Sequence, residues 1–256
     1  AREIIKSLKT GDETIALRKC AQVNRQVEAE FERLRSGLPK DQASKQNASD
    51  VIVKRLKVLE KSTRDVYERN ARLFDSERSK RLEEKGWLDR FSDLLPKRAK
   101  VLDIGCGAGE PIAQYLISQG FEVEGIDFSE AMLGIVRGRF PNQHWHLMDM
   151  RELSLSSRFD GIIAWHSFFH LSHDDQELTL PRIIKHLEPH GVLLLTVGDH
   201  YGESVGRVGT EEIYHASFSL EAYEKILSSL DMKVLALVPN DTLCGMASVL
   251  LAQKGA

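Results

Sequence analysis

The first residues that could do chemistry are an aspartate and three glycines in the stretch VLDIGCGAGE. Gly105, Gly107 and Gly109 would let the backbone turn tightly and approach a ligand without Cβ clashes. The dinucleotide fingerprint G-x-G-x-x-G is not met, because Glu110 stands three residues after Gly107, and the Lys-Ser or Lys-Thr of a P-loop does not follow. The Asp103 carboxylate would repel a pyrophosphate and attract an ammonium group. The stretch therefore predicts a close-fitting site for a ligand that carries a positive charge.

A second carboxylate stands at the end of the next predicted strand. Asp127 follows Gly109 by 18 residues, where an acidic side chain can accept hydrogen bonds from the two hydroxyls of a ribose. An amine beside Asp103 and a ribose beside Asp127 describe S-adenosylmethionine better than any nucleotide phosphate. The two acids therefore predict S-adenosylmethionine as the cofactor and S-adenosylhomocysteine as its product.

Titratable side chains gather later in the chain, in segments predicted to project from the same side of a sheet. Methyl transfer from a sulfonium is a direct displacement, so a protein mainly aligns the acceptor and, where necessary, removes a proton. His170 and Tyr214 lead the candidates because FFHL and YHASF combine aromatic walls with a titratable group, as small-molecule pockets do. His166 completes the predicted catalytic set. The predicted substrate contacts are Phe169, His200 and His215.

A metal-dependent variant of this chemistry would need a set of ligands. Asp149, Asp199 and His200 are the alternative that the sequence offers, but the spacing required for metal ligation is not evident among them. We therefore expect no metal.

These residues need a scaffold, and from residue 99 short apolar runs alternate with amphipathic ones. The predicted strands are 100–105, 121–127, 144–149, 159–166, 191–198, 233–239 and 247–253. The predicted helices are 110–120, 129–140, 174–187 and 219–230. This order predicts an α/β fold with a doubly wound, mostly parallel seven-stranded sheet and a ligand at the carboxyl ends of the strands. The last two strands are too close in sequence for a helical crossover, so we expect an antiparallel hairpin at the sheet edge.

The N-terminal part has a different pattern. Apolar residues recur at intervals of three and four over 1–35, a polar tract with glycine and proline follows, and a second helix is expected to start at Ser49 or Asp50. Residues 1–60 are therefore predicted to form a helical hairpin in front of the main domain, an extension that serves as a lid, a dimer contact or a partner contact. Residues 61–256 would form the catalytic domain.

Four stretches carry a resemblance to a known family. From residue 62 to residue 254 the sequence resembles the class I, seven-strand S-adenosylmethionine-dependent methyltransferases, with VLDIGCGAG, GIDFSEAML, MDM and FDGIIAWHSFFHL in the family's order. The resemblance implies that the glycine loop passes under the methionine part of the cofactor. It also implies that Asp127 binds the ribose hydroxyls, with Phe128 and Met132 flanking the nucleoside.

The same resemblance assigns five further residues. Asp149 would contact the adenine amino group, with Met150 beside the ring. Trp165 and His166 would lie near the cofactor and the methyl-transfer axis. Tyr67, in VYERNARLFD, would lie on a helix that folds over the methionine end.

Composition limits the class of protein. The 256 residues suffice for one full α/β core, and no apolar run approaches the length of about 20 residues that crosses a bilayer. AREIIKSLKT lacks the apolar core of a secretory signal, so we expect a cytoplasmic protein. The net charge of −3 argues against a nucleic-acid surface, although residues 1–60 hold 13 Lys and Arg against 9 Asp and Glu. The three cysteines are expected to be free thiols: Cys20, Cys106 and Cys244.

These patterns predict methyl transfer to an oxygen or nitrogen nucleophile of a small molecule, with no membrane partner. The stretch AWHS is not the Asn/Asp-Pro-Pro-Tyr/Phe box that holds a flipped base. Two alternatives stay open. One is an RNA or protein methyltransferase that uses the basic N-terminal arm, and the other is a non-catalytic regulatory protein that binds the cofactor. A homodimer or a protein partner could form through the N-terminal helices.

Overall fold

The computed structural model describes residues 42–256, which divide into two units at Val58 and Leu59. The helix predicted over 1–35 lies outside the described residues. Of the first unit, only the beginning of helix α3 (Gln42–Glu77) is described, and this helix continues into the second unit. It starts before Ser49, where we expected it to begin, because the polar tract after residue 41 contains Gln, Ala and Lys, which favour helix.

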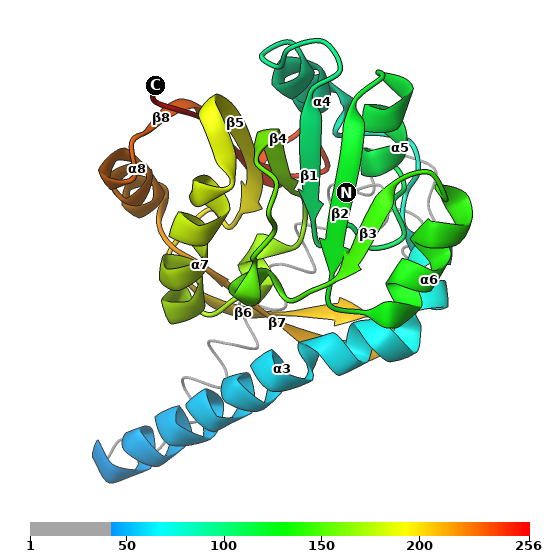
Figure 1. Ribbon diagram of the computed structural model, residues 1–256. Helices are drawn as coiled ribbons and strands as arrows, with labels where there is room; N and C mark the ends of the chain where they lie inside the picture. Colours follow the sequence, from blue (N-terminus) through cyan, green and yellow to red (C-terminus); the bar gives the residue numbers. More distant parts are fainter. Residues whose placement is uncertain (1–41) are drawn as a thin grey trace. The chain divides into compact units, whose positions relative to one another are not determined.

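The second unit contains the seven-stranded sheet that the sequence predicts. The strands follow the order β3-β2-β1-β4-β5-β9-β8 (Figure 1). Their bounds are β1 Lys100–Ile104, β2 Glu122–Asp127, β3 His144–Leu147, β4 Phe159–Ala164, β5 Leu187–Val197, β8 Met232–Asp241 and β9 Ala247–Lys254. The first five are parallel, whereas β9 pairs antiparallel with both β5 and β8, which confirms the edge hairpin.

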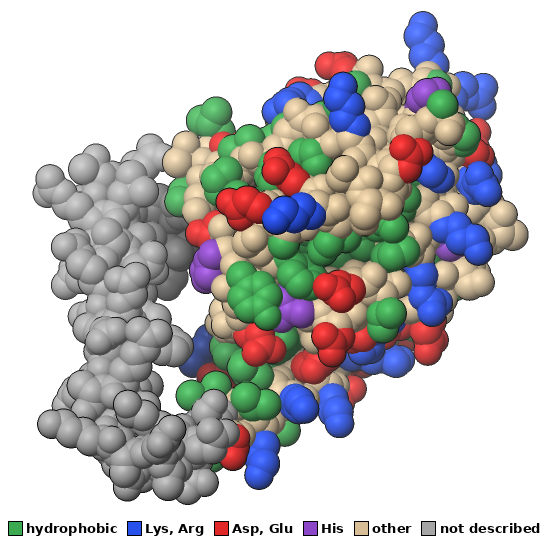
Figure 2. All heavy atoms as spheres, turned by 90° about the vertical axis from the view of Figure 1, so that its left-hand side faces the viewer, with side chains coloured by type: hydrophobic (Ala, Val, Ile, Leu, Met, Phe, Trp, Pro, Cys, Tyr) green, Lys and Arg blue, Asp and Glu red, His purple; other side chains and the backbone are tan. Residues whose placement is uncertain are grey.

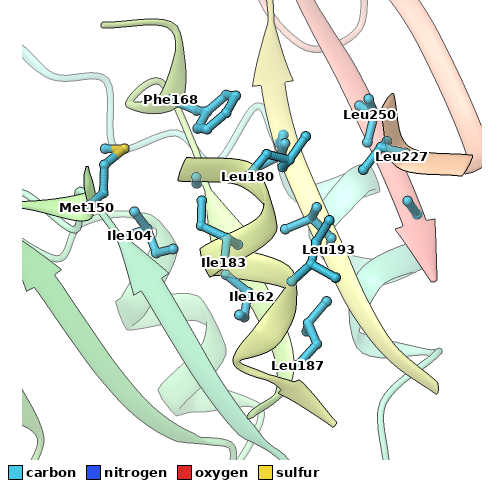
Figure 3. Packing of buried hydrophobic residues seen from close by; sticks show 14 of the residues in the cluster. Ile104, Met150, Ile162, Phe168, Leu180, Ile183, Leu187, Leu193, Leu227 and Leu250 are labelled. Carbon is cyan, nitrogen blue, oxygen red and sulfur yellow. The ribbon is translucent and has the colours of Figure 1, made fainter. Parts of the chain in front are cut away.

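Helices cover both faces of this sheet, which is why its central strands are apolar on both sides. One face packs against α4 (Lys85–Ser92), α5 (Ile112–Ser118) and α6 (Glu130–Arg139), and the other against α7 (His173–Lys185) and α8 (Leu220–Ser229). Successive side chains of a strand point to opposite faces of the sheet, so Val101 packs against the first group of helices and Leu102 against the second. Figure 3 shows the second core, with Leu180 and Ile183 of α7 near Ile162 and Leu193.

A two-stranded sheet, like the short helix α4, is a part of the fold that the sequence analysis did not predict. Strands β6 (Gly202–Val208) and β7 (Glu211–Ser217) form an antiparallel hairpin after β5, in a segment we had described only as a source of candidate bases. Val208 pairs with Glu211, so the connection is the two residues Gly209 and Thr210, and Gly209 has a φ of 56°. Glycine at the first position of a two-residue loop is a recognised hairpin signal, and it was overlooked.

The second half of α3 packs on this hairpin within the same unit. Val66 forms an apolar cluster with Val208 and Ile213. Arg69 and Asn70 both donate hydrogen bonds to the Glu211 carboxylate, at 2.6 and 2.7 Å. These contacts place the C-terminal half of the helix across the carboxyl ends of the strands. No helix within residues 42–256 is long and apolar enough to cross a membrane.

Candidate functional site

A pocket of about 870 Å3 lies where the carboxyl ends of β1, β2 and β4 meet the C-terminal half of α3, and we call it the main pocket. It brings together twelve of the predicted site residues. Six come from the glycine loop and the strand ends, namely Asp103, Gly105, Gly107, Gly109, Asp127 and Phe128. The other six surround them: Tyr67, Met132, Met150, Trp165, His166 and His170.

The glycine loop forms the floor of the main pocket, and its geometry requires glycine. Gly105, Gly107 and Gly109 have φ values of 71°, 51° and 81°, in the left-handed region that other residues rarely adopt. A Cβ on Gly105 would lie 2.4 Å from the Cβ of Ser167, and a Cβ on Gly109 would lie 2.6 Å from a methyl group of Val136. The loop is therefore pressed against its supporting elements while its other side faces the pocket.

Two buried carboxyl groups lie above this floor. Asp127 accepts hydrogen bonds from the backbone N–H groups of Gly107 (2.9 Å) and Ser129 (2.8 Å), which fix its orientation. Burial raises the pKa of Asp127 to about 6. Burial, with the nearby Asp127 charge, raises the pKa of Asp103 to about 7. A cationic ligand placed between them would favour the ionised form of both acids.

Arg78 is a pocket residue that the sequence analysis missed. It lies just beyond the end of α3, it lines the main pocket, and its guanidinium donates to Glu84 at 2.9 Å. Its positive charge acts against the rise in the pKa of Asp103. Asp103 and Arg78 together would suit a ligand with both an ammonium and a carboxylate group, as in an amino acid. No local motif marks this arginine, so only the folded chain reveals it.

Trp165 adds a buried polar atom to the wall of the main pocket. Its side chain is buried in the pocket wall, and its indole Nε1 has no hydrogen-bond partner within the described part of the chain. A buried donor without a partner is rare in native structures and is often explained by a ligand or ion at the site. The acceptors Asp103 and Asp127, with the donors Arg78 and Trp165, fit a nucleoside that bears an amino acid.

The C-terminal half of α3 closes the main pocket from above. Glu68 accepts a hydrogen bond from the Ser129 hydroxyl at 2.6 Å, and Asp75 forms an ion pair with Arg139 at 2.5 Å. Next to the Glu68 anchor, the Tyr67 ring lies 6.0 Å from the Phe128 ring, centroid to centroid. The helix is thus fastened at two places over the pocket, with Tyr67 facing into it.

Tyr67 and His170 form a hydrogen-bonded chain at one end of the pocket. His170 Nδ1 lies 3.0 Å from the backbone carbonyl of Tyr214, which can only accept, so Nδ1 carries the proton. The neutral ring therefore accepts at Nε2, and the Tyr67 hydroxyl donates to it at 3.0 Å. Burial lowers the pKa of His170 to about 4 and raises the pKa of Tyr67 above its usual value. At neutral pH, both groups are uncharged.

His166 stands beside this pair in an unusual backbone conformation. Its φ is 54°, and its N–H donates to the Thr196 hydroxyl at 2.6 Å. Desolvation in the concave pocket, with the Arg78 charge, lowers the pKa of its imidazole to about 3. Its side chain remains accessible to solvent, so it is open to a ligand as a neutral group.

Five predicted residues lie outside the main pocket, and the first two are Asp149 and Tyr214. Asp149 caps the short 3₁₀ helix η1 (Met150–Glu152) and pairs with Arg151 at 2.7 Å. The Tyr214 side chain is buried, and its hydroxyl donates to Glu203, so only its backbone carbonyl contacts His170.

The three predicted substrate contacts line a second space, the hairpin cavity, of about 540 Å3 between the end of β5 and the β6–β7 hairpin. They are Phe169, His200 and His215. Phe169 lies on the short 3₁₀ helix η2 (Phe168–His170), next to the main pocket. The alternative metal ligands are used otherwise, because His200 pairs with Asp199 at 2.6 Å. Among residues 42–256, no group of three or more His, Cys, Asp or Glu side chains could hold a metal ion.

Comparison with known proteins gives one family and several relatives. Residues 74–237 match the model of the family described as "Methyltransferase domain", and residues 1–36 match that of a domain of unknown function (DUF6538). A dTDP-3-amino-3,6-dideoxy-alpha-D-glucopyranose N,N-dimethyltransferase from Streptomyces fradiae is 36% identical over 102 residues, which are 39% of this chain and 40% of that protein. A trans-aconitate 2-methyltransferase from Variovorax paradoxus is 32% identical over 117 residues, or 44% of each chain. The chain thus spans less than half the length of these curated relatives.

A solved structure has the same fold. The 1,6-didemethyltoxoflavin-N1-methyltransferase of Burkholderia thailandensis, a complex with 1,6-didemethyltoxoflavin and S-adenosylhomocysteine, aligns with a TM-score of 0.61 and 20% identity. The alignment covers 79% of this chain and 90% of the other. The region that matches the family model contains the glycine loop, both buried acids, Arg78 and His170, whereas Tyr67 precedes it.

Proposed function

The chain belongs to the class I S-adenosylmethionine-dependent methyltransferases, and from this premise we propose that it methylates a nitrogen or oxygen atom of a small molecule. The observation that carries the proposal is the set of charged side chains that line the main pocket. Asp103 and Arg78 provide opposite charges for the two ends of an amino acid, and Asp127 is oriented by two backbone N–H groups toward a diol. When bound, S-adenosylmethionine supplies an electrophilic methyl group on its sulfonium.

In this proposal, different residues of the main pocket bind different parts of the cofactor. Asp103 binds the ammonium group and Arg78 the carboxylate of the methionine part. Asp127 accepts hydrogen bonds from the ribose hydroxyls, for which its oxygens retain free lone pairs. Phe128 and Met150 enclose the nucleoside between an aromatic ring and a thioether.

Tyr67 and His170 provide the route for a proton. Once methylated, an acceptor atom that still carried its proton would be strongly acidic. The Tyr67 oxygen takes the acceptor's proton while its own proton moves to His170 Nε2, 3.0 Å away. Because the pKa of His170 is only about 4, this relay accepts a proton only once the acceptor has become acidic.

Two further observations support a small molecule as the acceptor. The names of the relatives from Streptomyces fradiae and Variovorax paradoxus refer to a nucleotide sugar and to trans-aconitate. Figure 2 shows Asp and Glu side chains interspersed with Lys and Arg side chains on the face that it draws. Such a mixed surface is unlike the basic stripe of a protein that binds nucleic acid.

Transfer of label tests the proposal. The full chain is incubated with methyl-labelled S-adenosylmethionine and a cell extract separated into small-molecule, RNA and protein fractions. We expect label in the small-molecule fraction, and none with the variant Asp127→Ala. Label in RNA or protein alone would overturn the small-molecule assignment. Binding of S-adenosylhomocysteine without label in any fraction would favour a regulatory protein.

A further inference from the structure

We propose that the hairpin cavity is the acceptor subsite, and that it takes an uncharged planar compound with an N–H or O–H group while rejecting anions. The role as acceptor subsite rests on the proposed function. Binding of such a compound is measurable without any cofactor.

The polar contact for this compound is His215 on β7. Its Nε2 is buried and has no hydrogen-bond partner within the described residues. Desolvation, with the neighbouring His170, lowers the pKa of His215 to about 3, so the ring is neutral at physiological pH. A neutral imidazole has one donor and one acceptor nitrogen, so Nε2 accepts a hydrogen bond from an N–H or O–H group of a ligand in the tautomer that carries its proton on Nδ1. Pairing of this kind would remove an unsatisfied buried group.

The flat shape is inferred from the rings around His215. The Phe169 and His215 rings are 4.7 Å apart, and the His170 and His215 rings are 4.9 Å apart, centroid to centroid. On the neighbouring strand, Gly206 leaves room for the histidine, because a Cβ there would lie 2.3 Å from His215 Cε1. An aromatic wall held in this way favours ligands that offer a π-face or a ring edge.

The charge of the cavity excludes anions. Asp199 and Glu203 line it, and no Lys or Arg side chain is among the described residues that do so. Asn240 donates to Asp199 at 2.8 Å, and the Tyr214 hydroxyl donates to Glu203, so both carboxylates are held in place. Arg207 lies on the same hairpin, but it pairs with Glu212 at 3.8 Å and does not line the cavity. A carboxylate or phosphate ligand would therefore meet repulsion from two carboxylates, while the lining His200 ring is already paired with Asp199.

The position of the cavity suits an acceptor. The segment from His166 to His170 separates the two spaces, with Phe169 lining the hairpin cavity and both terminal histidines lining the main pocket. The His166 and Phe169 rings are 5.9 Å apart, centroid to centroid. A nucleophile must come within about 3–3.5 Å of the methyl carbon, so an acceptor in the hairpin cavity would have to reach past these two side chains.

Binding of matched probes tests the proposal. The full chain without cofactor is titrated, by ligand-observed NMR and calorimetry, with quinolin-4-one, indazole and 4-hydroxyindole. Quinoline-4-carboxylate and indazole-3-carboxylate serve as the anionic counterparts of the first two. We expect at least one neutral probe to bind roughly tenfold more tightly than its carboxylate, and His215→Phe, which keeps a ring but removes Nε2, to weaken it roughly tenfold. Absence of binding by all neutral probes, a preference for carboxylates, or unchanged affinity in H215F would overturn the proposal.

Two further variants separate charge and folding from the hydrogen bond. The double variant Asp199→Asn, Glu203→Gln should strengthen quinoline-4-carboxylate binding severalfold and leave the neutral probe unchanged. If H215F does not fold, Gly206→Ala, which displaces the same ring, replaces it and should weaken the neutral probe. S-adenosylhomocysteine is titrated in parallel. Its failure to bind the unaltered chain would count against the proposed function, while the probe series would still decide the nature of the cavity.

Discussion

The main pocket and the hairpin cavity lie on either side of residues 166–170, and they are built in opposite ways. The main pocket is formed at successive strand ends, and its acids have raised pKa values near 6 and 7. The hairpin cavity lies between the end of β5 and a separate two-stranded sheet, and the pKa of His215 in its wall is lowered. Buried acids favour a cationic ligand, whereas a buried neutral imidazole favours an uncharged hydrogen-bonding one. The difference suggests why two unlike compounds would bind side by side without exchanging places.

Asp127→Ala should have the largest effect on the main pocket. Loss of two hydrogen bonds between a charged group and a diol should weaken S-adenosylhomocysteine binding about 100-fold in a calorimetric titration. Asp199→Ala is the matched control, because it removes an aspartate after another strand end on the side of the hairpin cavity. An equal loss in both variants would contradict the assignment of the cofactor to the main pocket alone.

Gly105→Ala should destabilise the floor of the main pocket. The residue has a φ of 71°, and the new Cβ would lie 2.4 Å from Ser167 Cβ. We expect a loss of about 2–3 kcal/mol, seen as a fall of roughly 5–10 °C in Tm. Gly134→Ala, on helix α6 with no atom within 4 Å of its Cβ, should leave Tm unchanged or slightly raised. If Gly105→Ala left Tm unchanged, the loop would not need its left-handed turn.

Tyr67→Phe should separate proton transfer from cofactor binding. The ring that faces Phe128 is kept, but the hydroxyl that donates to His170 is lost. We expect kcat to fall about tenfold or more, while S-adenosylhomocysteine affinity changes less than about threefold. Steady-state kinetics with the identified acceptor provide the measurement. A large loss of affinity with unchanged kcat would make Tyr67 a binding residue only.

Asp103→Asn should stabilise the protein without ligand at high pH. The folded-state pKa of Asp103 is raised to about 7, so the folded chain binds its proton more tightly than the unfolded chain does. Stability from this group is therefore full below a pH of about 4 and is lost as the pH rises through about 7. We expect the variant to be more stable by ~4 kcal/mol at pH 8, since the pKa of Asp103 is raised from 3.8 to about 7, and the difference to vanish near pH 4 in thermal melts. If Asp103→Asn destabilised the folded chain at both pH values, the raised pKa of Asp103 would be contradicted.

The same two regions show what the sequence could predict. Asp103, the three glycines and Asp127 were found because a strand, a tight turn and the next strand place them together within a short segment. The parallel sheet and its antiparallel edge followed from the alternation of apolar runs and from one short connection. These features depend on local sequence.

The rest depended on tertiary contacts. Tyr214 was predicted as a base, but β-sheet pairing turns its hydroxyl to Glu203 and leaves only its carbonyl for His170. Arg78 follows a helix with no motif around it, so its place in the pocket required the folded chain. The β6–β7 hairpin was missed although the sequence Gly-Thr between two strands could have indicated it. Side chains brought together by long-range pairing carry little local signal.

Proton release on ligand binding tests the central claim most directly. If the ammonium group of S-adenosylhomocysteine binds beside Asp103, the pKa of that carboxyl falls and its proton leaves. Calorimetric titrations at pH 7 in buffers of different ionisation enthalpy should then report release of about half a proton for each ligand bound, because the pKa of Asp103 is about 7. The release should disappear with Asp103→Asn. Binding without proton release, or a release that persists in that variant, would contradict the account.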